Sequence, residues 1–160
     1  MNPYASEEPV KVKYENDEKE RLAIHLYSRP VSVVDRRLAK IILVIGGTGT
    51  GKTTLLNTLV TYCLGIERED NIRYSIVLEP EPDQTKSVTS EVTEYFVEGT
   101  QRNPPLIIID TPGFNDTGVD RTDDDIFEAI RLYITDEEKI DRIHAVCFVG
   151  ISSLARLTPS

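Results

Sequence analysis

The stretch that decides the fold is Gly46-Gly47-Thr48-Gly49-Thr50-Gly51-Lys52-Thr53. It matches the phosphate-loop pattern G-x-x-x-x-G-K-[ST] at every fixed position. Residues 40–45 before it form a β-rich apolar run, as expected for a strand buried on both faces. After it, apolar residues recur at helical spacing over 55–64, and Gly65 supplies a stop. A strand, a glycine loop and a helix in this order predict a site for a nucleoside triphosphate.

The glycine loop carries the groups that a triphosphate requires. Glycines let the backbone wrap closely around phosphate, and a helix that begins near Lys52 adds the positive end of its dipole. We expect Lys52 to reach the β and γ phosphates and the Thr53 hydroxyl to ligate Mg²⁺. A dinucleotide-binding loop is disfavoured, because Thr54 stands where its third glycine should be. The predicted phosphate-binding residues are Gly46, Gly47, Thr48, Gly49, Thr50, Gly51, Lys52, Thr53, Thr54 and Gly113.

A second motif, Asp110-Thr111-Pro112-Gly113, follows the buried apolar run over residues 106–110. The D-x-x-G spacing alone carries little weight, but its position at the end of a strand does. The carboxyl ends of parallel strands meet at one edge of a sheet, so Asp110 is expected beside the glycine loop. There it would hold the Mg²⁺ shell, usually through water, and Gly113 would offer its N–H to the γ phosphate.

The rest of the chain indicates an α/β protein. Further strands are predicted over 90–98 and, fully buried, over 143–149, with a short one at 74–78 in the long connection that precedes residue 90. Asp123–Ile134 has helical period, and Thr122 with Asp125 three residues later fits a helix cap. Buried strands that alternate with helices predict a three-layer sandwich, with a mostly parallel sheet and helices on both faces.

Two domains of unequal kind are expected. Residues 1–39 are predicted to be an N-terminal arm, partly disordered, whose first 21 residues lack periodicity. Residues 40–160 are predicted to be the N-terminal portion of a P-loop domain. The ending after residue 149 resembles a loop that enters a further helix, so we expect a domain that is incomplete at its C-terminus.

Composition excludes several classes of function. The chain has 160 residues, 39% hydrophobic and 28% charged, and a net charge of −9 that lies entirely in residues 40–160. A surface this acidic disfavours nucleic acid as the partner. No apolar run is long enough to span a membrane, and the charged N-terminus is not a signal peptide. Cys63 and Cys147 lie in apolar elements and are expected as buried thiols, which favours the cytoplasm.

The two motifs together resemble those of P-loop GTPases. The sequences of residues 49–57 (GTGKTTLLN) and 110–116 (DTPGFND) are similar to the corresponding motifs of the branch that contains septins and the immunity-associated (AIG-type) GTPases. The resemblance extends over residues 40–159. It implies a switch that binds GTP with Mg²⁺, hydrolyses it slowly and often self-associates through its nucleotide face. It also implies a Mg²⁺-binding threonine in the first switch loop, for which Thr85 and Thr89 are candidates and Thr89 is favoured.

The sequence departs from the GTPase pattern in two places. Phe114 follows Gly113 where Ras-like enzymes carry the glutamine that orients water, so no catalytic residue is assigned. Turnover is expected to be no faster than the roughly 10⁻⁴ s⁻¹ of an unassisted GTPase. The guanine-reading motif [NT]-K-x-D is absent from these 160 residues, so the choice between guanine and adenine stays open.

The leading hypothesis is therefore a Mg²⁺-dependent GTP-binding switch with slow hydrolysis, in which a partner or a second protomer supplies missing groups. The alternatives are a GTP-dependent assembly module without catalysis, an ATP-binding P-loop protein, and a fragment that folds poorly alone.

Overall fold

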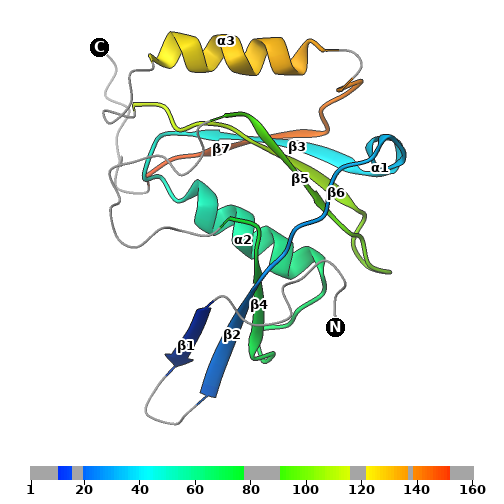
Figure 1. The fold of residues 1–160 in the computed structure, drawn as a ribbon, viewed down its shortest axis with the longest axis vertical. Helices are drawn as coiled ribbons and strands as arrows, with labels where there is room; N and C mark the ends of the chain where they lie inside the picture. The colour runs from blue at the N-terminus through cyan, green and yellow to red at the C-terminus, as the bar shows by residue number, and fades with distance from the viewer. Residues whose placement is uncertain (1–10, 16–19, 78–90, 116–121, 137–138, 152–160) are drawn as a thin grey trace.

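The structure is a computed structural model that describes residues 11–15, 20–77, 91–115, 122–136 and 139–151. Within these ranges the chain forms two sheets and three helices, whose arrangement can be followed in Figure 1. The larger sheet has the order β5-β6-β3-β7, in which β6 and β7 run parallel to β3 and β5 runs antiparallel to β6. Its strands are β3 (Lys40–Gly46), β5 (Thr93–Val97), β6 (Leu106–Asp110) and β7 (Ala145–Val149).

Helices cover both faces of this sheet, as the sequence predicts. Helix α2 (Lys52–Cys63) lies on one face and α3 (Asp123–Ile134) on the other (Figure 1). Alternate side chains of a strand point to opposite faces, so β6 contributes side chains to two hydrophobic cores, one on each face of the sheet. Leu106 and Ile108 pack with Leu56 and Val60 of α2, whereas Ile107 and Ile109 pack with residues of α3 such as Ile126. All five residues of β6 are buried, and the three-layer α/β sandwich of the P-loop NTPases is confirmed.

The smaller sheet contains residues that were expected to form a mobile arm. It has the order β1-β2-β4, with β1 (Lys11–Glu15) antiparallel and β4 (Ile72–Ser75) parallel to β2 (Glu20–Leu26). The sequence predicts a partly disordered arm over residues 1–39, and the structure forms β1 and the start of β2 within its first 21 residues. The sequences of these strands show little hydrophobic periodicity, because pairing with neighbouring strands stabilises them rather than their own apolar pattern. Strand β4 begins two residues before the predicted strand 74–78 and ends three residues before its predicted end.

Helix α1 (Val33–Leu38) leads from the smaller sheet into β3 and is short but firmly capped. Ser32 and Asp35 form a capping box, in which each side chain bonds the other residue's backbone N–H. The Arg29 guanidinium pairs with the Asp35 carboxylate at 3.1 Å and lies over the Phe96 ring. Arg36 forms a two-bond ion pair with Glu94 on β5. These contacts tie the chain before β3 to the edge of the main sheet.

Strand β7 is less buried than predicted. The run 143–149 was expected to be covered on both faces, but Val146 is 59% exposed and Phe148 72% exposed. Both lie on the α3 face of the sheet, beside Leu43 and Ile45 in register, whereas Cys147 and Val149 pack towards the α2 core. An apolar sequence indicates a strand, but it does not say whether anything in the described residues covers it.

Candidate nucleotide site

The glycine loop connects the end of β3 to the start of α2. It ends at Gly51, which has no side chain to bond the N–H groups of the first helical turn. Gly51 is the N-cap of α2 and adopts the left-handed conformation at φ 92°, which a residue with a side chain adopts only at a cost. With no side chain at its N-cap, α2 also has no acidic residue in its first turn. The helix dipole and the N–H groups of its first turn therefore form a site suited to an anion.

Lys52 folds back over the same loop. Its ammonium nitrogen lies 3.0 Å from the Gly46 carbonyl oxygen and 3.1 Å from that of Gly47, and the residue is only 8% exposed. Burial of an ammonium group is costly unless oxygen atoms surround it. The loop thus holds a buried cation at the helix end, where the phosphates of a nucleotide would find both positive charge and N–H donors.

Asp110 lies where the strand pairing predicts, beside the end of β3. It pairs in register with Val44 and is 1% exposed. It shares its face of β6 with Leu106 and Ile108, which pack towards α2, so its carboxylate belongs to the side on which α2 begins. The pKa of Tyr95 on β5 is raised by burial first and by the negative charge of Asp110 second. A buried carboxylate thus stands on the face that α2 covers.

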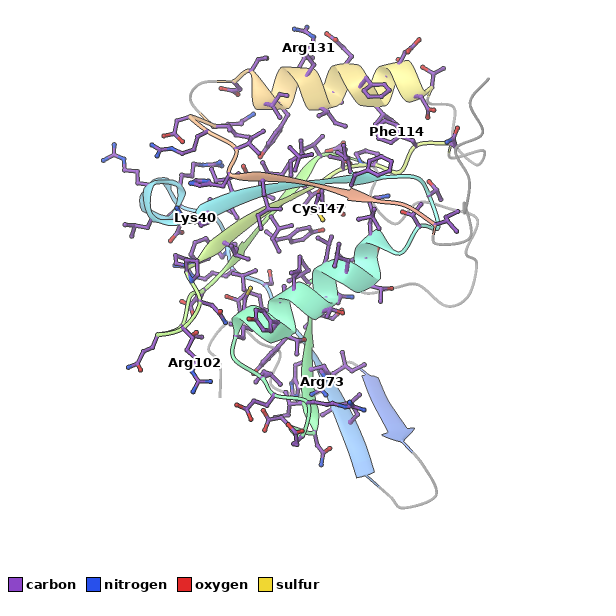
Figure 2. The ribbon with its side chains drawn as sticks, turned by 180° about the vertical axis from the view of Figure 1, so that it is seen from behind. Lys40, Arg73, Arg102, Phe114, Arg131 and Cys147 are labelled. Atoms are coloured by element: carbon purple, nitrogen blue, oxygen red, sulfur yellow. The ribbon has the colours of Figure 1, made fainter. Side chains whose placement is uncertain are left out.

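Phe114 joins the two motifs through its backbone. Its N–H donates to the Gly46 carbonyl oxygen at 3.2 Å, and its carbonyl oxygen accepts from the Thr48 N–H at 2.9 Å. Gly113 must be glycine, because a Cβ there would lie 2.8 Å from both N and Cα of Thr48. The Phe114 ring packs against the Phe127 ring of α3 with centroids 4.8 Å apart, on the α3 side of the sheet in Figure 2. The side chain is therefore part of the packing.

The residues present fit a magnesium ion shared with a nucleotide. Within the described ranges, no three His, Cys, Asp or Glu side chains gather into a cage. Mg²⁺ does not need one, because it keeps several waters and is held by one or two protein oxygens plus phosphates. Asp110 is buried at the strand end, and Thr53 is a half-buried hydroxyl in the first turn of α2. Thr85 and Thr89, the candidates from the first switch loop, lie outside the described residues.

Three polar side chains near the site have roles that the sequence analysis missed. The Thr111 hydroxyl is buried and donates to the Val44 carbonyl oxygen at 3.0 Å, which locks the end of β6 to β3. Asn57 and Thr61 of α2 bond the backbone of β4 and the residues just after it, at Tyr74, Ile76 and Val77. Their spacing of four residues on one helix face is the signal that could have revealed them.

The cysteines and His144 contribute to packing and strand pairing and lie outside the nucleotide site. Cys63 and Cys147 are both free, and burial raises the pKa of the Cys63 thiol. The His144 Nδ1 accepts the Ile41 N–H at 3.0 Å, so this histidine secures the start of β7 to β3. None of the helices in the described part of the chain is long and apolar enough to cross a bilayer.

Comparison with known proteins agrees with this geometry. The family model described as Septin matches residues 37–147, which include both motifs. The chain is similar to Septin homolog spn1 of Schizosaccharomyces pombe (strain 972), with 35% identity over 82 residues. That match covers 51% of this chain and 16% of the relative. No solved structure gives a significant match. The chain belongs to the septin family and has the P-loop NTPase fold.

Proposed function

We propose that this chain is the phosphate-binding part of a Mg²⁺-dependent GTP switch that hydrolyses its nucleotide slowly. The observation that carries the proposal is the uncapped start of α2, where the Lys52 ammonium lies within 3.1 Å of two loop carbonyl oxygens. Lys52 and the loop N–H groups bind the phosphates. Thr53 and Asp110, the latter through water, hold Mg²⁺, and Thr89 is the proposed switch ligand. The septin match supports guanine as the base and the cytoplasm as the compartment.

The position of Phe114 supports the proposal that hydrolysis is slow. Its ring packs on Phe127 and its backbone is bonded to Gly46 and Thr48, so it offers no group that could orient an attacking water. Mg²⁺, when bound, would neutralise charge on the phosphate oxygens. The residues of this chain then bind and orient the phosphates, and a second protomer at the nucleotide face would supply what hydrolysis lacks.

Binding of a GTP analogue in the presence and absence of Mg²⁺ tests the proposal on the full chain. Replacing Lys52 by Met keeps the aliphatic stem and removes the positive charge proposed to bind the β and γ phosphates, so affinity should fall by about a hundredfold or more. Lys40, an exposed lysine at the start of β3, gives the matched control Lys40→Met, which should bind as the parent does. Equal affinity of Lys52→Met and the parent would reject the site.

A non-catalytic assembly module is the second candidate, and Phe114 is the observation that favours it. Turnover per protomer should rise steeply with protein concentration if a second copy completes the catalytic site. Turnover that stays near zero at all concentrations, despite tight GTP binding, would favour the assembly module. Competition between GTP and ATP for the same protein distinguishes the GTP switch and the assembly module, which should prefer GTP, from an ATP-binding protein, which should prefer ATP.

A further inference from the structure

The two threonines inside the glycine loop have opposite surroundings. The Thr50 hydroxyl donates to the Gly47 carbonyl oxygen at 2.8 Å, so it is satisfied within the loop. The Thr48 hydroxyl oxygen is buried and has no hydrogen-bond partner among the described residues. Burial of a polar atom without a partner costs free energy, so such an atom in a functional loop calls for an explanation.

Thr48 lies at the contact between the loop and the D-x-x-G motif. Its N–H donates to the Phe114 carbonyl oxygen, and its hydroxyl is the closest atom to the place where a Gly113 side chain would begin. Gly113 is the residue whose N–H is proposed to bind the γ phosphate. A hydroxyl that touches Gly113 is therefore beside the part of the site that a triphosphate fills and a diphosphate leaves vacant.

We propose that the Thr48 hydroxyl donates a hydrogen bond to the terminal phosphate and so makes the site prefer a nucleoside triphosphate over a diphosphate. This inference rests on the proposed function and adds a specificity-determining side chain to it. A phosphate oxygen is an anionic acceptor, which makes the bond stronger than one to a neutral group. The hydroxyl oxygen is buried beside Gly113, so this bond requires the two loops to separate as the terminal phosphate enters.

The sharpest test replaces Thr48 by Val, which keeps the shape and removes the hydroxyl. On the full chain with Mg²⁺, affinity for the non-hydrolysable imido analogue of GTP should fall by about tenfold or more, while affinity for GDP stays within about twofold. Thr48→Ser keeps the hydroxyl and should restore the preference. The control Thr50→Val removes a satisfied bond and should weaken both nucleotides alike.

Melting without nucleotide gives a second readout that does not depend on turnover. Thr48→Val should melt at or above the temperature of the parent, because it removes a buried atom without a partner. A lower melting temperature than the parent would contradict the inference. If the parent binds both nucleotides and Thr48→Val binds them equally well, the inference fails alone. If the parent binds neither, the proposed function fails with it.

Discussion

The starts of helices α2 and α3 are built in opposite ways. At α3, Thr122 and Asp125 form a capping box, and all three residues of the first turn are aspartates. At α2, Gly51 offers no side chain, and the first turn has no acid. Both helices have twelve residues, so both have orphan N–H groups of the same kind. Helix α3 bonds a first-turn N–H to the Thr122 hydroxyl and places carboxylates beside it, whereas the N-cap of α2 offers no side chain at all.

The start of α1 shows that capping is the rule in this chain. Ser32 and Asp35 repeat the arrangement of Thr122 and Asp125, down to the hydroxyl-to-carboxylate contact of 2.6 Å in one and 2.7 Å in the other. Self-capping stabilises a helix end by about 1 kcal/mol. The chain forgoes this stabilisation at α2 alone among the three described helices, and that is where its binding motif lies.

The largest effect should come from giving α2 a cap of its own. Gly51→Asp places a carboxylate at the N-cap, where it competes for the N–H groups and repels phosphate. We expect GTP-analogue affinity to fall by about a thousandfold, which corresponds to about 4 kcal/mol. Gly51→Ala is the matched control, since it carries the strain of φ 92° without the charge. If Gly51→Asp and Gly51→Ala lose the same affinity, strain and not the anion site explains the loss.

Acid should weaken the capped start of α1. Burial alone raises the pKa of Asp35, but the Ser32 hydrogen bonds and the Arg29 guanidinium outweigh it, so the pKa lies below its ordinary value. A lowered folded-state pKa means that the stabilisation is present above the unfolded value, near 3.8, and is lost as the pH falls through the folded value.

Replacing Asp35 by Asn should therefore destabilise the protein by about 2 kcal/mol at pH 7 and by progressively less below about pH 4. Urea unfolding of both proteins between about pH 2.5 and pH 7 measures this difference. A difference that does not change with pH would mean that packing, and not the carboxylate charge, stabilises the start of α1.

Removing the cap of α3 should affect stability but not binding. Thr122→Ala loses the acceptor for the Asp125 N–H, which lies 3.2 Å from the hydroxyl, and should cost about 1 kcal/mol. Thermal melting should shift down by about 2–4 °C. Nucleotide affinity should stay within twofold of the parent. A larger loss of affinity would show that the two helix ends are not independent.

The smallest effect is expected at the contact between α3 and the D-x-x-G motif. Phe127→Leu keeps an apolar side chain but removes ring stacking on Phe114, and it should cost about 0.5–1 kcal/mol. Urea unfolding measures this cost, and the exposed Leu132→Ala on the same helix is the control. An unchanged midpoint would mean that the ring contact does not anchor the motif.

Features with local causes were predictable from the sequence. The bounds of α3, its Thr122 cap and the strand at Leu106–Asp110 match the prediction, because capping residues and a run of buried β-branched side chains act within a few residues. The place of Asp110 beside β3 followed from the rule that parallel strands share an edge.

Features with distant causes were not predictable. Strand β1 needs β2, and β2 needs β4 from beyond α2, so no pattern inside residues 1–21 reveals them. The exposure of Phe148 depends on what covers β7, and the pattern of apolar residues does not contain that information. The roles of Thr48 and Thr111 depend on contacts between two motifs far apart in the chain.

The central position of β3 has a consequence for synthesis on the ribosome. Lys40 pairs with Leu106 and Ile42 with Ala145, so β3 leaves the exit tunnel long before either neighbour exists. Closing such long loops is slow, and until then the strand exposes unpaired backbone edges and apolar side chains. The glycine loop receives its Phe114 contacts only after β6 has been made. The nascent chain thus carries the complete phosphate-loop motif well before that loop can be anchored.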